Sequence, residues 1–370
     1  MNFSFDEDQQ SLGDTVAQVL ADFPALTGPE MSTENDGAAW NALAQIGLFS
    51  LLVPEEEGGV GLSLVDLALA VEGLGSGLAP PLVASTLIAT EVFTRYAPEG
   101  SRKALFGAIA GGQKKIAIAI LEPGQDDPLS GHCSLSDGVL TGRKIAVAGA
   151  LDADLFLVLA QVSGRATPVL VDSSAPGVVR RAHDSLDPSA GLGAVDFQGV
   201  SPLQDCVFGE GAAECLLDVA ATVEAGIAIG IGASMTDRAV EYAKTRQQFG
   251  QPIGAFQTIK HRCADMAVSV EAGRATAYYA FWTCGTKAFD QSQRASSAKA
   301  YCSEIARDVC NDSLQIHGGM GFTWELALHR YLRRAKVLLN SLGGSAWHYR
   351  RVFEKSLVDV ASPDVQRDAA

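Results

Sequence analysis

The pattern of apolar residues changes twice along the chain, and this change limits the possible folds more than any other feature. Residues 114–212 hold short apolar or alternating runs, such as Val139–Val147 and Leu155–Val162, separated by Gly, Pro, Asp and Ser. Such runs predict a compact antiparallel sheet. The sequence on both sides has helical spacing, and from residue 216 onward it forms long Ala-rich stretches. This order predicts an α+β fold, because a doubly wound fold would alternate strands with helices.

Three segments follow from this pattern. We expect a helical domain over residues 1–112, a β domain over residues 113–212 and a second helical domain over residues 213–370. A chain of 370 residues with 47% apolar residues is long enough to bury more than one core.

Charge and cysteine usage narrow the class of partner. The net charge of −15 argues against nucleic acid or an anionic membrane, because both repel a surface of their own sign. The longest apolar stretch, Leu216–Met235, is interrupted by Asp218 and Glu224, so we expect no membrane span. Seven cysteines without metal-like spacing indicate free thiols in a reducing compartment. The expected location is the cytoplasm.

The first motif covers residues 242–254, Tyr-Ala-Lys-Thr-Arg-Gln-Gln-Phe-Gly-Gln-Pro-Ile-Gly, and continues through residues 256–266. It predicts a helix that ends at Gly250, a turn on Pro252 and Gly254, and a second helix that begins near Phe256. By composition alone, the segment is an ordinary αα-hairpin.

The second motif covers residues 314–325, Leu-Gln-Ile-His-Gly-Gly-Met-Gly-Phe-Thr-Trp-Glu. Glycines at three of four consecutive positions leave backbone N–H groups uncovered, and such a concavity accepts phosphate oxygens. His317 has no second ligand at metal-binding spacing, so we expect no metal site. Basic residues that follow at 330, 333, 334 and 336 fit either a solvated helix face or a phosphate-binding face.

Together, the two motifs resemble the acyl-CoA dehydrogenase family, and weaker similarity covers nearly the whole chain. The resemblance implies a helical domain, a β domain and a C-terminal four-helix bundle. It also implies an acyl-CoA substrate, FAD as cofactor, a homo- or hetero-oligomer and an electron-transferring flavoprotein as electron acceptor. In the family, both motifs reach across a subunit interface to the ADP part of FAD. The residues that match these contacts are Arg246, Phe249, Gln257, Gln315, Gly318 and Gly319.

The catalytic base departs from the family pattern. The reaction needs a carboxylate that takes the α-proton of the thioester while the β-hydride passes to flavin. The usual glutamate position is Leu342 here, and a second position used by some members is Ala220. Glu224 lies one turn further along the same helical face, inside an apolar stretch where an acid is costly unless it is paired or functional. The candidate base is therefore Glu224. The alternative is an interhelical hydrogen bond or a subunit contact.

A second departure lies in the β domain. The family has a Gly-Ser-Asp turn and a Trp-Ile-Thr run beside the flavin ring, and this chain has Gln125–Asp127 and Ala146–Ala148 instead. The chain thus resembles the smaller or non-classical subunits of heteromeric acyl-CoA dehydrogenases. Three readings follow: an active dehydrogenase or subunit, a catalytically silent subunit that completes a partner's FAD site, and a flavin oxidase or monooxygenase on the same fold. An acyl-CoA-binding module without flavin is disfavoured by Arg246 and the glycine motif.

Overall fold

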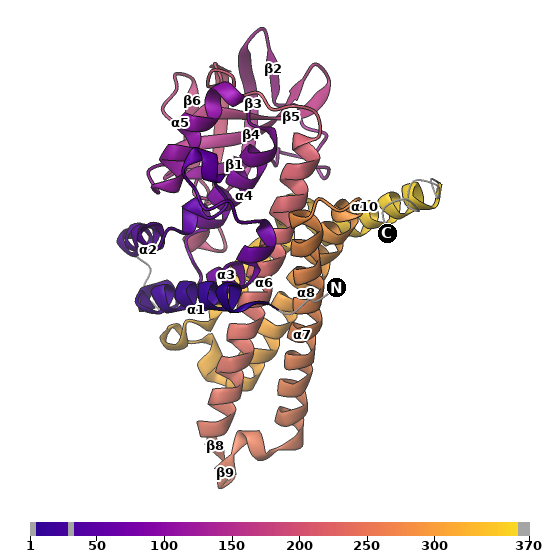
Figure 1. Cartoon of the computed structure of the whole chain (residues 1–370). Helices are drawn as coiled ribbons and strands as arrows, with labels where there is room; N and C mark the ends of the chain where they lie inside the picture. The colour runs from indigo at the N-terminus through magenta and orange to yellow at the C-terminus, as the bar shows by residue number, and fades with distance from the viewer. Residues whose placement is uncertain (1–4, 29–32, 362–370) are drawn as a thin grey trace.

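The N-terminal part of the chain is a set of helices linked by short 3-10 turns (Figure 1). The computed structural model describes residues 5–28 and 33–361. The first helix begins after Asp6, whose carboxylate accepts a hydrogen bond from the Gln9 backbone N–H, while the Gln9 side chain bonds back to Asp6. This capping box satisfies N–H groups that have no partner within the helix. The helices are α1 (Glu7–Ala21), α2 (Thr33–Gln45), α3 (Ala68–Ser76), α4 (Pro81–Tyr96) and α5 (Glu99–Ala110).

A seven-stranded sheet follows, at the top of the molecule in Figure 1. Its order is β1-β4-β2-β3-β7-β6, and β5 pairs with β4. Most neighbours are antiparallel, but β4 pairs in parallel with β1 and with β2. The strands are β1 (Ile116–Ala119), β2 (Ser134–Ser136), β3 (Val139–Val147), β4 (Leu155–Val162), β5 (Arg165–Asp172), β6 (Val178–Ala182) and β7 (Gly193–Val200).

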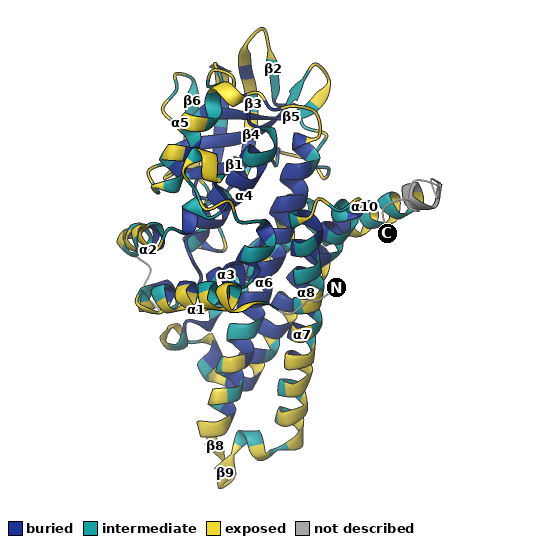
Figure 2. Ribbon diagram, viewed as in Figure 1, coloured by how far each residue is buried: buried dark blue, intermediate teal, exposed yellow. Residues whose placement is uncertain are grey.

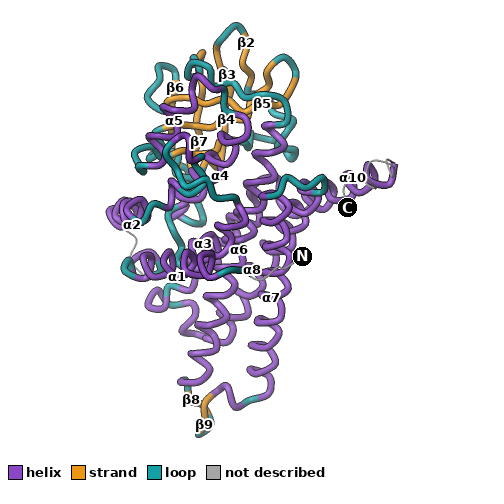
Figure 3. The backbone as a smooth tube through the Cα atoms, in the orientation of Figure 1, coloured by secondary structure: helices purple, strands orange, loops and turns teal. Residues whose placement is uncertain are grey.

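The C-terminal part consists of long helices that pack side by side (Figure 3). A small hairpin, β8 (Gln247–Gln248) and β9 (Gln251–Pro252), joins the first two of them at the end remote from the sheet. The helices are α6 (Ala212–Thr245), α7 (Gln257–Gly285), α8 (Gln291–His317), α9 (Leu328–Asn340) and α10 (Gly344–Ala361).

The central helix α6 connects the sheet to the bundle. It is long and apolar enough to cross a membrane by length and composition, yet 89% of its most apolar window is buried inside the protein. Figure 2 shows that its upper part is buried and that its lower end, near β8 and β9, is exposed. A helix that is apolar on all sides belongs in a core, so the structure places α6 there.

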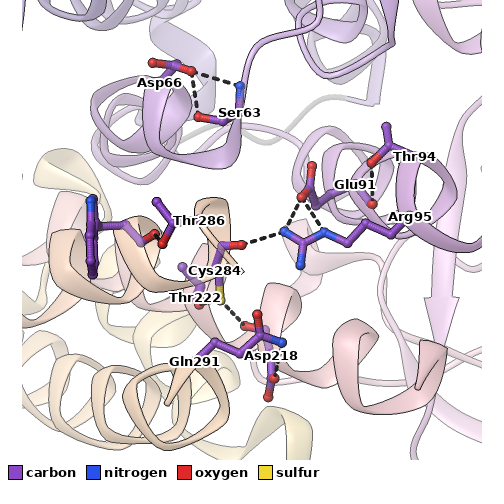
Figure 4. Close-up of polar contacts among 11 residues, drawn as sticks. Ser63, Asp66, Glu91, Thr94, Arg95, Asp218, Thr222, Cys284, Thr286 and Gln291 are labelled. Atoms are coloured by element: carbon purple, nitrogen blue, oxygen red, sulfur yellow. Dashed lines mark hydrogen bonds and ion pairs between the residues drawn. The ribbon is translucent and has the colours of Figure 1, made fainter. Parts of the chain in front are cut away.

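A buried polar cluster fastens the N-terminal helices to the bundle (Figure 4). Arg95 on α4 pairs with Glu91 one turn earlier, and both side chains are less than a tenth exposed. The Arg95 guanidinium also donates a hydrogen bond to the Cys284 carbonyl at the end of α7, at 2.6 Å. The same carbonyl accepts a backbone hydrogen bond from Lys287 N–H at 3.3 Å, so an arginine from a distant segment adds a second donor at the C-terminal end of α7.

The expected α+β fold is confirmed, with three differences in detail. The sheet is mixed, because β4 has parallel neighbours. Strands β2 and β6 were not expected, and neither was helix α10. The domain limits remain predictions, and residues 1–4, 29–32 and 362–370 within them lie outside the described part of the chain.

Candidate active site

A cavity lies where the sheet, α4, α6 and the end of α9 meet. It encloses about 1010 Å³ of space between atoms, with its open mouth included. Its lining is mostly apolar, and many lining residues are small. Strands β1 and β3 and the residues that directly follow them contribute Ile118, Ile120, Leu121, Ile145, Ala146 and Ala148. Helices α3, α4, α6 and α9 contribute Leu74, Gly75, Pro81, Ala84, Ser85, Ile88, Ala220, Glu224, Ile227, Arg334, Val337 and Leu338. The remaining lining residues, from shorter segments, are Leu78, Ala79, Pro80, Ala190, Leu192, Ser341 and Leu342.

Glu224 is the one acidic side chain in this lining among the described residues, and its side chain is 18% exposed. Its Oε2 accepts a hydrogen bond from the Ser341 hydroxyl and lies 3.4 Å from the Lys299 ammonium. Burial raises the pKa of Glu224, while the Lys299 charge and these hydrogen bonds oppose that shift. The structure thus brings Glu224 into the cavity as a partly protected carboxylate. Its role as base remains a prediction.

The usual base position, Leu342, lies beside Glu224 in the same cavity. Leu342 follows Ser341 directly, is 6% exposed and adopts a left-handed backbone conformation with φ 56° and ψ 30°. A non-glycine residue in this region costs on the order of 1–2 kcal/mol. The loop holds this strained turn against the cavity while presenting a side chain that cannot accept a proton.

The sheet wall of the cavity is apolar in its side chains. Strand β3 bulges between Lys144 and Val147, where the pairing with β7 shifts register and Ala146 has φ 51°. Bulges of this kind re-aim side chains next to active sites. Here the bulge presents Ala146, and Ala148 follows it, so this wall offers a flavin ring main-chain groups but no side-chain hydrogen bonds among the described residues.

The first nucleotide motif lies at the opposite end of α6. Arg246 ends the helix and is exposed, and Gln257 begins α7. Phe249, between β8 and β9, is 92% exposed with φ 53°, and its ring meets Phe256 edge-on at 6.1 Å. An apolar ring left so exposed indicates a surface that another molecule covers.

The second motif meets the first through an aromatic contact. The rings of Tyr242 and His317 stack with their centres 4.3 Å apart, which holds the end of α8 against α6. Gln315 is exposed, Gly318 has φ 59°, and a side chain added at Gly318 or Gly319 would meet no atom within 4 Å. The structure therefore brings both motifs to the same end of the bundle, where the Gly318–Gly319 backbone is open and the Arg246 side chain is exposed. This arrangement fits a pyrophosphate.

Glu224 and Arg246 are far apart within one chain. About six turns of α6 separate them, which at about 1.5 Å per residue amounts to ~33 Å. The cavity and the end of α6 that carries the two motifs are therefore two separate candidate half-sites.

Two of the four basic residues of α9 have neither of the two expected roles, whereas Lys336 is exposed to solvent. Arg330 and Arg334 are about 95% buried. Arg330 donates to the carbonyls of Ala25 and Gly28, and Arg334 pairs with Asp187 at 2.7 Å. These two arginines join α9 to the N-terminal helices and to the sheet.

His317 donates a hydrogen bond from Nδ1 to the Ser313 carbonyl at 2.7 Å. Among the described residues, no three His, Cys, Asp or Glu side chains are arranged to hold a metal ion.

The sequence analysis missed Lys299 and Ser341, which contact the candidate base. A signal was present for Lys299, because it lies between Ala298 and Ala300 in an Ala-rich helix where a solvated lysine is out of place. Ser341 carried no such signal, since its contact with Glu224 joins positions 117 residues apart.

Comparison with known proteins shows the family of the chain. The acyl-CoA dehydrogenase C-terminal domain matches residues 209–357, and the N-terminal domain of the same family matches residues 6–113. Acyl-CoA dehydrogenase IpdE2 of Mycobacterium tuberculosis is 32% identical over 339 residues, which cover 89% of this chain and 91% of that protein. Acyl-CoA dehydrogenase FadE34 of the same organism is 34% identical over 344 residues, but they cover 91% of this chain and only 45% of FadE34.

A solved structure agrees closely in fold. The Tcur3481-Tcur3483 steroid ACAD superposes with a TM-score of 0.89 at 27% identity, over 96% of this chain and 99% of that one.

Proposed function

Since the chain belongs to the acyl-CoA dehydrogenase family, an FAD-dependent family of oxidoreductases, we propose that it takes part in the α,β-dehydrogenation of an acyl-CoA thioester with Glu224 as base. The observation that supports this proposal most is the single carboxylate in an apolar cavity, beside the loop that carries the usual base in relatives.

Glu224 has the chemistry that the first half of the reaction requires. The thioester carbonyl acidifies the neighbouring C–H bond, and a desolvated carboxylate takes that proton more readily than a solvated one. When bound, FAD supplies the acceptor for the β-hydride. The proton then resides on Glu224 until the product leaves. The apolar walls exclude water from the reacting carbons.

The nucleotide-binding end of the chain fits the ADP part of FAD. Arg246 supplies a charged fork, Phe249 an exposed ring, and Gly318 with Gly319 an open backbone. Because this end lies ~33 Å from Glu224 along α6, we propose that it serves the FAD of a partner subunit. The functional unit is then an oligomer that shares its FAD sites.

The proposed substrate has a bulky or branched acyl group. Small residues line the cavity on several sides, including Gly75, Ala84, Ala190 and Ala220. A cavity with small walls is wide rather than narrow, so a ring system or a branched chain fits it better than a straight chain does. The similar structure described as a steroid ACAD agrees with a substrate of this shape.

A second function is a catalytically silent subunit that completes the partner's FAD site. Two observations favour it: Leu342 at the usual base position, and a sheet wall without side-chain donors for a flavin ring. In that case, the nucleotide-binding end remains functional while the cavity does not.

The visible spectrum of the purified protein separates the two functions. The chain is expressed alone and together with any homologous chain encoded beside it, and flavin per protomer is measured. One flavin per chain, bleached by an acyl-CoA in wild type but not in Glu224→Gln, supports the active enzyme. A colourless chain that gains half-stoichiometric flavin with its partner, with bleaching unchanged by Glu224→Gln, supports the silent subunit and rejects Glu224 as base.

A further inference from the structure

Lys299 is a buried lysine behind the candidate base. It lies on α8 and is 1% exposed, and its neighbours Ala298 and Ala300 are also buried. It does not line the cavity, whereas Glu224 does. The carboxylate therefore has one side toward the cavity and the other toward an ammonium that no substrate can reach.

Three acceptors surround the Lys299 ammonium, one for each of its N–H donors. The Leu338 carbonyl on α9 accepts one hydrogen bond, and the Ser303 hydroxyl accepts another at 3.2 Å. The third direction faces Glu224 Oε2 at 3.4 Å. One ammonium thus links α6 and α8 to the end of α9, three residues before Ser341.

Ser341 completes the arrangement from the other side, because its hydroxyl donates to the same oxygen of Glu224. Oε2 is held by two donors, whereas Oε1 has no hydrogen-bond partner in the described part of the chain and is free to face the cavity. We propose that Lys299 is a positioning residue that orients the Glu224 carboxylate toward the substrate and keeps it ionised to receive the α-proton. This inference rests on the proposed role of Glu224 as base.

Of the charged groups near Glu224, Lys299 is the one placed to stabilise the ionised carboxylate. Burial raises the pKa of Glu224 and lowers that of Lys299, and each group opposes the shift of the other. The other titratable groups nearby are Cys302 on α8 and His348 on α10, whose ring stays neutral. Arg351 on α10 is paired with Asp218 and Glu214, and Arg334 with Asp187. Without the Lys299 ammonium, Glu224 would lose the cation that opposes the effect of burial, and its pKa would rise further.

The same charge resets the base after each turnover. Once Glu224 has taken a proton, Lys299 is a buried ammonium that has lost its counter-charge. This favours release of the proton when the cavity reopens to water, which returns the ion pair.

The test measures α-proton exchange, which needs a base but no electron transfer. Phenylacetyl-CoA has acidic α-hydrogens and no β-hydrogen, so the FAD-loaded protein, with its partner chain where FAD loading requires one, can exchange it but cannot oxidise it. Deuterium incorporation from D₂O is followed by mass spectrometry across pH. The variants are Lys299→Met, Lys299→Arg and, as a control, Ser313→Ala, which removes a buried hydroxyl elsewhere on α8.

We expect Lys299→Met to shift the midpoint of the pH profile upward by at least about one unit, which lowers exchange about tenfold below the midpoint. Lys299→Arg keeps the charge and stays within a few-fold of wild type, and Ser313→Ala keeps the wild-type midpoint. A wild-type midpoint in Lys299→Met overturns the inference.

A second measurement does not depend on catalysis. The carboxyl carbon of Glu224, identified by its loss in Glu224→Gln, is titrated by ¹³C NMR in wild type and in the Lys299 variants. A higher midpoint in Lys299→Met than in wild type supports the inference, and equal midpoints reject it. If wild type shows no exchange while these midpoints differ, the role of Glu224 as base fails and the role of Lys299 stands. If Lys299→Met does not fold, Lys299→Arg decides: a midpoint close to wild type supports the inference, and a shift of a unit or more rejects it.

Discussion

His348 is fully buried on α10, and neither of its ring nitrogens has a hydrogen-bond partner among the described residues. Burial lowers the pKa of this imidazole to about 2, with the charges of Lys299 and Arg351 adding to the effect. In the unfolded chain the same group has an ordinary pKa near 6.5. Between these two values only the unfolded state binds the proton, so His348 makes the folded protein less stable as pH falls below about 6.5.

We therefore expect His348→Phe to weaken the acid sensitivity of folding. From this residue, wild type loses about 1.4 kcal/mol of unfolding free energy for each pH unit below the unfolded pKa, and the variant does not. Urea denaturation at pH 7.5 and pH 5.5 measures the difference. His261→Phe, at an exposed position on α7, is the control and should follow wild type. Equal pH slopes in His348→Phe and wild type would contradict the argument.

At the level of elements, single side chains connect helices that are distant in sequence. Figure 4 shows Arg95 reaching from α4 to Cys284 at the end of α7. The Thr222 hydroxyl on α6 lies 3.2 Å from the Cys284 sulfur, so three helices meet at this point. Because Glu91 is equally buried, this junction depends on the charge of Arg95 as well as on its length.

Arg95→Met should destabilise the protein by about 3–5 kcal/mol, because it leaves the Glu91 carboxylate buried without a partner. It also removes the side-chain hydrogen bond to the Cys284 carbonyl. The double variant Glu91→Gln/Arg95→Met should recover part of this loss, since no uncompensated charge remains. Lys103→Met, at an exposed site on α5, is the matched control. Chemical denaturation gives the three values, and a cost below 1 kcal/mol for Arg95→Met would refute the reasoning.

At the scale of the whole molecule, the two half-sites should respond separately to mutation. Arg246→Ala should weaken FAD binding about tenfold or more, because a charged hydrogen bond to a pyrophosphate is lost. It should leave the folding stability of the flavin-free chain unchanged, since Arg246 is exposed. Lys244→Ala removes the same charge from the exposed end of α6 and serves as control. Flavin titration and thermal denaturation test both statements, and equal flavin affinities of the two variants would contradict the assignment of Arg246.

The long apolar patterns in the sequence were sufficient to predict the fold class and the long helices. Short elements, and contacts between residues far apart in the sequence, could not be predicted from them. The helix expected from residue 216 to Gly250 is observed as α6 over Ala212–Thr245, and its predicted end was wrong because the β8–β9 hairpin begins at Gln247. The edge strand β6 was not predicted, because Arg180 and Arg181 interrupt its apolar pattern. Its hydrogen bonds to β7 determine its structure instead. The same limit applies to the site. The position of Glu224 on a helix face was predictable, but its partners come from α8 and from the loop after α9, which only tertiary packing brings together.

The length of α6 has a consequence for how such proteins diverge. If one chain contributes its cavity to one active site and its nucleotide-binding end to another, as we propose, a duplicated gene can lose one contribution without losing the other. Each of the two copies then supplies one part of the active site, and neither is functional without the other. Selection acts on the pair, and favours linked genes whose products are made in equal amounts.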